Sequence, residues 1–236
     1  MIPQRRQSGQ SMTEYIIILP VLFLLVFGAI QFALVYHAKT TLNYAAFEAA
    51  RIGALENASR AAIETAFFRG MAPLYTHEPD FEAALKARER LKREPERLCI
   101  ERINPRDDAF DDFALWDEEM GREVIPNDNL MYRGSDPRSN PEMPIQDANL
   151  LKLRVNYCYE LVVPFIKDAL RILLGTGETD PIYNPGGEWH KGFDEKDYGG
   201  FRHHCLTRMS GLPLQAQAIM RMQSPAVDDP FPTSCD

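Results

Sequence analysis

The feature that most constrains this chain is an apolar run near its N-terminus. It covers residues 16–36, about 21 residues, and contains no charged side chain. A helix needs roughly 20 apolar residues to cross a bilayer. The run is also longer than the roughly 7–15 apolar residues of an ordinary secretory signal. The sequence therefore predicts one membrane-spanning helix that the mature protein keeps.

The polar residues that precede the span predict a processing site. A carboxylate at the entrance of a membrane helix, here Glu14, is costly and therefore indicates a function. Gly9 suits a cleavage site because its backbone enters a protease cleft without a side chain. A cut after Gly9 would make Gln10 the first residue and Glu14 the fifth. Glu14 would then be placed to neutralise the amino terminus of a neighbouring subunit, since a buried charge needs a partner.

The charges around the span predict its orientation. Arg5 and Arg6 precede it, whereas His37 and Lys39, which follow it, are a weaker pair. Positive residues tend to stay in the cytoplasm. We therefore expect a short cytoplasmic N-terminus and an exported portion of about 200 residues, which is enough for one domain with its own core.

Composition limits the partners and the compartment. The chain has 34 acidic and 26 basic residues and a net charge of −8. Nucleic-acid binding calls for clustered Lys and Arg, so this balance argues against a nucleic-acid partner. All four cysteines lie in the exported portion, where disulfides are allowed: Cys99, Cys158, Cys205 and Cys235.

Four cysteines allow three pairings, and the sequence does not choose among them. Cys99 and Cys158 fall on the polar sides of two proposed strands, which favours pairing them and joining Cys205 to Cys235. A Cys158–Cys205 bridge is a close competitor, and free buried cysteines are a further alternative. A bridge would contribute about 2–4 kcal/mol to a domain rich in loops.

The pattern along the chain predicts an α+β fold. The apolar helix continues from Glu14 to about Leu55, and its second half carries a face of small residues that would pack on the chain's own domain or on another subunit. Helices are expected at 61–71, ended by Pro73, at 80–94 and at 164–174. Strands are expected at 98–103, 150–161 and 212–222. Residues 105–149 are expected to be mostly a long ordered loop with one short strand at most, and residues 175–204 a second loop. The residues after Ser224 are expected to form a loose tail, which a disulfide of Cys235 would tether.

Residues that could carry catalysis or bind metal follow no recognised spacing. His203, His204 and Cys205, with His190, match no common zinc signature. The aspartates between 107 and 112 lack the spacing of an EF-hand and are expected to form a solvated acidic loop. We therefore expect no enzyme, no cofactor and no metal site.

The N-terminal motifs resemble those of the TadE-like family of minor pseudopilins, which belong to the tight-adherence (Flp) type IV pilus system. The resemblance rests on Gly9, on the Glu14–Tyr15 pair, on Leu19–Pro20 within the span and on the stretch 44–51. It implies that a prepilin peptidase cuts after Gly9 and that Glu14 and Tyr15 act in subunit assembly.

The resemblance also implies an organisation and a role. Residues 1–9 would be the leader, 10–56 the transmembrane and pilin-like helix, and 57–236 an exported periplasmic α+β domain. The protein would sit in the bacterial inner membrane and assist pilus assembly or initiation, in contact with lipid, other pilin subunits and the inner-membrane machinery. The alternative is an unprocessed, signal-anchored periplasmic binding domain that holds a ligand or metal near His190 and Cys205.

Overall fold

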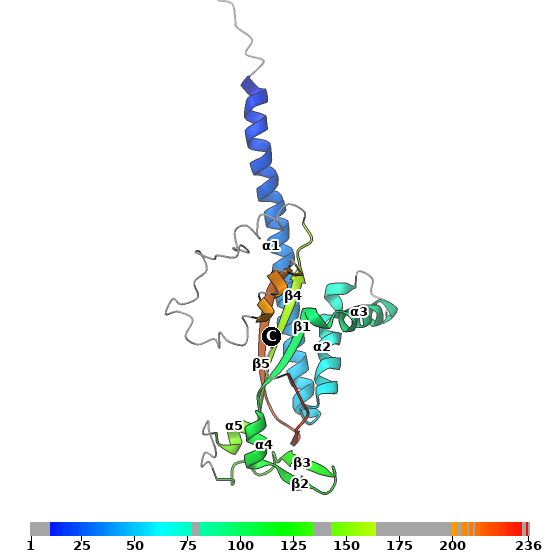
Figure 1. Ribbon diagram of the computed structural model, residues 1–236, viewed down its shortest axis with the longest axis vertical. Coiled ribbons are helices and arrows are strands. Elements are labelled where there is room, and N and C mark those ends of the chain that lie inside the picture. Colours follow the sequence, from blue (N-terminus) through cyan, green and yellow to red (C-terminus); the bar gives the residue numbers. More distant parts are fainter. Residues whose placement is uncertain are drawn as a thin grey trace, which may run out of the picture.

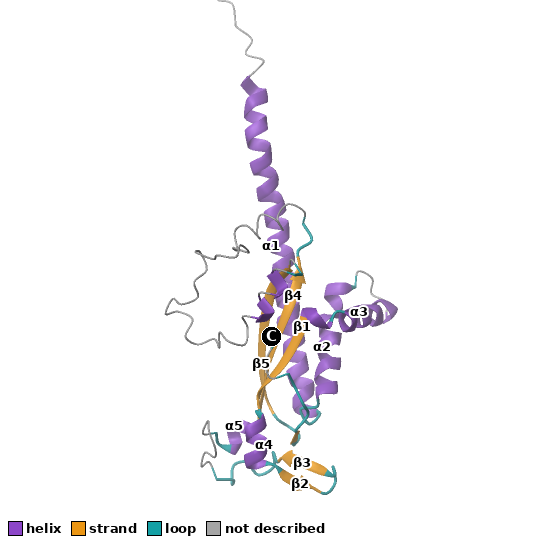
Figure 2. Cartoon of the chain, viewed as in Figure 1, coloured by secondary structure: helices purple, strands orange, loops and turns teal. Residues whose placement is uncertain are grey.

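A computed structural model describes residues 10–76, 81–134, 143–163, 200–202, 204–206, 208–209, 211–232 and 235. The chain consists of one long helix, α1 (Gln10–Leu55), and an α+β domain built on its second half (Figure 1). Two small antiparallel sheets and several short helices make up the domain (Figure 2). The predicted fold class is confirmed.

Helix α1 has 46 residues, so it is about 69 Å long at 1.5 Å per residue. It begins four residues before the predicted start at Glu14 and continues through Pro20. Its end at Leu55 is as predicted. The chain then reverses through Asn57 and Ala58, which both have a positive φ, and enters the next helix.

Helix α2 (Arg60–Tyr75) runs along α1, and helix α3 (Phe81–Arg93) contacts α2 (Figure 1). The prediction that Pro73 ends α2 is wrong, because the helix continues for two more residues. Proline removes one backbone donor and clashes with the carbonyl four residues earlier, which by itself favours the end of a helix. Leu74 and Tyr75 are instead held by the core, and a 3-10 turn, η1 (Pro95–Arg97), follows α3.

The main sheet has the order β1-β4-β5 and is antiparallel throughout. Its strands are β1 (Leu98–Asn104), β4 (Leu150–Glu160) and β5 (Gly211–Arg221), close to the three predicted strands. Side chains of the central strand, β4, alternate between two faces as expected, but both faces are buried from Leu153 to Tyr159. Its apolar face lies against α1 and α2 and joins the core. The largest fully buried apolar side chains are Phe67, Leu42, Ile63, Met71, Ile125, Leu151, Leu153 and Val155.

The segment expected to be mostly loop, 105–149, is more ordered than predicted. It forms α4 (Asp107–Phe113), β2 (Leu115–Asp117), β3 (Arg122–Ile125) and α5 (Ile145–Ala148). Strand β3 pairs with β2 and with β6 (Ala226–Val227), which makes the second sheet. These short elements lie at the end of the domain away from the N-terminus of α1 (Figure 1). The acidic run 107–112 is helical because Ala109, Phe110 and Phe113 bury one face of α4.

Candidate assembly site: an exposed apolar stalk on a disulfide-linked domain

The first half of α1 is an apolar rod that the domain does not cover (Figure 1). Large side chains are exposed along it, such as Ile16 at 71%, Leu25 at 65% and Phe32 at 72%. An exposed apolar surface of this extent marks a membrane or protein contact, because water disfavours it. The length and composition fit a single-pass membrane anchor.

The residues predicted for processing and assembly lie at the start of this rod. Gly9 is outside the described residues, so cleavage after it stays a prediction. Gln10 is the first residue of α1. Glu14 and Tyr15 lie on the exposed surface of the next turn, where a neighbouring helix or a lipid can reach them.

The second half of α1 packs on the chain's own domain, which decides between the two alternatives left open for its small-residue face. Six apolar residues of that face are fully buried: Ala38, Leu42, Ala45, Ala46, Ala49 and Ala50. Helix α2 approaches so closely that a Cβ on Gly70 would lie 2.7 Å from the Cα of Ala45. Gly53 is equally enclosed, because a Cβ there would lie 2.7 Å from Ile63 and 2.8 Å from Leu151.

The opposite face of this half stays exposed and carries aromatic side chains. Tyr36, Tyr44 and Phe47 are 63%, 59% and 48% exposed. They continue the uncovered apolar surface of the rod towards the domain. Arg51, one turn after Phe47, pairs with Glu48 at 3.2 Å. A second helix could therefore pack along α1 without displacing any part of the described domain.

Polar contacts also fix α1 and α2 to the sheet. Lys39 of α1 donates a hydrogen bond to the backbone carbonyl of Gln215 on β5, and burial lowers the pKa of its ammonium group. Tyr75 of α2 and Tyr157 of β4 share a hydroxyl–hydroxyl hydrogen bond. Burial raises the pKa of both phenols, since the interior disfavours the phenolate.

Two disulfides link the polar side of the main sheet to later parts of the chain. Cys99 is bonded to Cys235, and Cys158 to Cys205. The preferred pairing, Cys99 with Cys158 and Cys205 with Cys235, is wrong, whereas the competing Cys158–Cys205 bridge is confirmed. Cys99 and Cys158 do share a sheet face, but Cys99 lies opposite Asn156, so the two cysteines are diagonal neighbours and not direct partners. Both bridges meet in one small buried cluster with Phe201.

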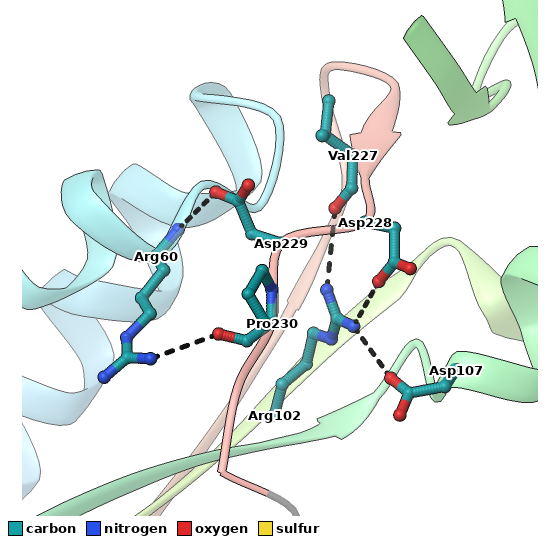
Figure 3. Close-up of polar contacts among 7 residues, drawn as sticks. All are labelled: Arg60, Arg102, Asp107, Val227, Asp228, Asp229 and Pro230. Carbon is teal, nitrogen blue, oxygen red and sulfur yellow. Dashed lines mark hydrogen bonds and ion pairs between the residues drawn. The ribbon is translucent and has the colours of Figure 1, made fainter.

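The C-terminal segment is held at several points and is not the predicted loose tail. The side chain of Arg102 is 1% exposed, and its guanidinium group is 3.1 Å from Asp107 and 3.0 Å from Asp228 (Figure 3). It also lies over the rings of Phe110 and Phe231, which adds cation–π attraction. Sequence analysis missed Arg102 because nothing in a strand pattern distinguishes a buried, paired arginine from a solvated one.

The same segment closes the end of α1. The backbone N–H groups of Gln223 and Ser224 donate to the carbonyl of Ala54, which is otherwise one of the unpaired carbonyls of a helix end. Asn57 donates through its side chain to the carbonyl of Pro225, at 2.8 Å. On α2, the Arg60 backbone N–H donates to Asp229 (Figure 3).

The candidate metal ligands do not form a usable set in the described part of the chain. Cys99, Glu101 and Cys235 lie within 4.8 Å of one another, but the two sulfurs are bonded to each other and offer no thiolate. Cys205 is likewise in a disulfide, and His190 and His203 lie outside the described residues. Asp107 pairs with Arg102.

Taken together, the described residues define an α+β domain, linked by disulfides and built on one long apolar helix that fits a single-pass membrane anchor. Residues 9–51 match the family model described as TadE-like protein. The resemblance expected from Gly9, Glu14 and Tyr15 is thus confirmed over that segment, which covers most of α1. No curated protein and no solved structure matches the chain.

Proposed function

We propose that this protein is a minor pseudopilin that assists the assembly or initiation of a tight-adherence (Flp) pilus. The proposal rests on one observation: the TadE-like match, residues 9–51, covers nearly the same residues as helix α1, whose first half is exposed. The family implies a place in that pilus system. In this proposal the protein acts by assembly and not by catalysis, and it needs no cofactor.

The proposed steps follow from the chemistry of the N-terminus. A prepilin peptidase cuts after Gly9, and the mature chain keeps α1 in the inner membrane with its domain in the periplasm. Glu14 then pairs with the amino terminus of an adjacent pilin or pseudopilin subunit, because two opposite charges tolerate a low-dielectric setting better than either alone. The exposed aromatic face around Tyr44 and Phe47 supports helix packing between subunits.

Processing is tested by the intact mass of the protein extracted from membranes. We expect the loss of residues 1–9 in the wild-type chain and their retention in Gly9→Leu, whose side chain would obstruct the protease cleft. Gly28→Leu is the matched control, because a Cβ at Gly28 meets nothing within 4 Å, and it should be processed normally. A wild-type mass that still includes Met1 would refute the pseudopilin assignment.

Assembly is tested separately with Glu14→Ala. This variant should insert in the membrane and be processed, yet produce fewer pili than the wild type in electron micrographs. Ile17→Leu, a change of equal volume at an exposed position one turn later, serves as the control and should leave piliation normal. Normal piliation by Glu14→Ala would remove Glu14 from the mechanism without affecting the processing proposal.

A further inference from the structure

The face of α1 that packs on the domain starts inside the apolar span. Gln31 is 2% exposed, although the residues around it, such as Ile30 and Phe32, are exposed at 47% and 72%. Gln31, Val35, Ala38 and Leu42 follow one another at spacings of four, three and four, which is one face of a helix. The domain therefore covers α1 about one and a half turns before the predicted span ends at residue 36.

The cover over Gln31 is the segment that follows β4. Strand β4 ends at Glu160, and residues 161–163 continue beside α1 towards its apolar half (Figure 1). The backbone N–H of Val163 donates to Oε1 of Gln31 at 2.9 Å. Leu161 and Val163 are buried, whereas Val162 between them is 68% exposed.

Distances along α1 place this segment at the lipid boundary. If the hydrocarbon layer covers residues 16–36, Gln31 lies five residues, about 7.5 Å, inside its outer edge at 1.5 Å per residue. If the layer instead ends at Gln31, its inner edge lies about 20 residues earlier, near residue 11. In both registers Val163, which is hydrogen-bonded to Gln31, lies at the outer interface or about 7.5 Å inside the edge of the hydrocarbon layer.

The chemistry of the segment suits that position. A backbone N–H away from water must find a partner within the protein, and Gln31 supplies one for Val163. Val162 exposes an apolar side chain directly before Val163, whose backbone is hydrogen-bonded to Gln31 within the apolar span. Glu160, the nearest charge in sequence, is 3.5 Å from Arg97 and so is partly neutralised.

We propose that residues 161–163 form a membrane-contact loop, with Val162 in the outer lipid interface and Gln31 as the residue that positions it. The loop would fix the height of the domain above the bilayer and restrict its rotation about α1. The occupant of this surface is lipid, because the surface continues the lipid-facing side of α1. The inference rests on α1 spanning a membrane, which the proposed function also requires.

The test uses the full chain in vesicles of phosphatidylcholine and phosphatidylglycerol with brominated acyl chains, which quench tryptophan. Trp116 and Trp189 are first replaced by phenylalanine. Single tryptophans are then introduced by Val162→Trp, by Leu25→Trp in the span and by Leu115→Trp in β2, which is 55% exposed at the far end of the domain (Figure 1). We expect quenching and a blue-shifted emission for Leu25→Trp, an intermediate effect for Val162→Trp and none for Leu115→Trp.

The outcomes test the membrane-contact loop and the membrane span separately. Quenching of Leu25→Trp with no more effect on Val162→Trp than on Leu115→Trp overturns the membrane-contact loop and leaves the pseudopilin proposal intact. A lack of quenching for Leu25→Trp overturns the span and both proposals. Adding Gln31→Leu to Val162→Trp should reduce its quenching, because the Val163 amide loses its partner. Unchanged quenching in that combination overturns the positioning role of Gln31, and non-reducing peptide mapping verifies that both disulfides still form.

Discussion

Gly70 is the position at which one added methyl group should disturb the domain most clearly. It lies on α2, where a Cβ would come within 2.7 Å of the Cα and 2.9 Å of the Cβ of Ala45 on α1. Ordinary contacts between carbon atoms are about 3.5–4.0 Å, so Gly70→Ala forces the two helices apart by roughly 1 Å. Because the nearest atom belongs to the backbone, it cannot turn away as a side chain would.

Two opposing effects determine the change in the free energy of unfolding. Overpacking of a close contact costs about 1–3 kcal/mol. Replacing glycine with alanine inside a helix returns about 1 kcal/mol. Since the clash is with backbone, we take the upper end of the cost and expect Gly70→Ala to be destabilised by about 2 kcal/mol. For a chain of this size that corresponds to a Tm lower by about 4–8 °C.

The assay is thermal and urea unfolding of the full chain in detergent micelles, followed by near-UV circular dichroism. Gly134→Ala is the matched control, because a Cβ there meets nothing within 4 Å, and its Tm should stay within about 2 °C of the wild type. Adding Ala45→Gly to Gly70→Ala should restore part of the loss by removing the Cβ contact. A Gly70→Ala protein at least as stable as the wild type would refute the close approach of α1 and α2.

Three further results are expected. Replacing Cys99 and Cys235 together with serine should cost about 2–5 kcal/mol, because that disulfide closes a loop of 136 residues, and the loss is measured by urea unfolding. Arg102→Met should cost about 1–3 kcal/mol through the loss of its ion pairs and ring contacts, and limited proteolysis should then cut the C-terminal segment faster. Stability should fall as the pH rises above 10, the ordinary phenol pKa, because the folded state raises the pKa of Tyr157 and Tyr75 and therefore retains protons that the unfolded state has lost.

Each of these three predictions has a control or a result that would contradict it. Non-reducing peptide mapping that finds a Cys99–Cys158 bridge would contradict the disulfide assignment. Arg106→Met, a change in an exposed arginine, should leave proteolysis of the C-terminal segment unchanged, and equal sensitivity in both variants would refute the role of Arg102. Tyr157→Phe should weaken the alkaline loss of stability, and a profile identical to the wild type would exclude the buried tyrosine pair as its cause.

The sequence predicts the parts of this fold in which a long apolar pattern determines the structure. Helix α1 and strands β4 and β5 each carry a regular pattern over more than ten residues, so their type and bounds could be predicted closely. Most of the apolar run predicted as a span, up to Ile30, is the part of α1 that the domain leaves uncovered.

The remaining features depend on contacts between distant residues and have no local signal. Cys99 pairs with Cys235 because the C-terminal segment returns to β1, which no pattern near either cysteine indicates. Strand β6 has two residues and exists only through its pairing with β3. In the sequence, Gln31 is only a single polar residue within an apolar run. Its role follows from its hydrogen bond with Val163, which is distant in the sequence.

The return of the C-terminal segment also sets the order in which the protein can mature. Strand β5, the closure over the end of α1 and the Cys99–Cys235 bridge all depend on residues 211–235, so the sheet lacks an edge strand until those residues have been synthesised. Until then, β4 has an open edge, the Ala54 carbonyl at the end of α1 lacks its partners, and Cys99 cannot form its disulfide. The domain therefore completes its fold only after the last cysteine has been added to the chain.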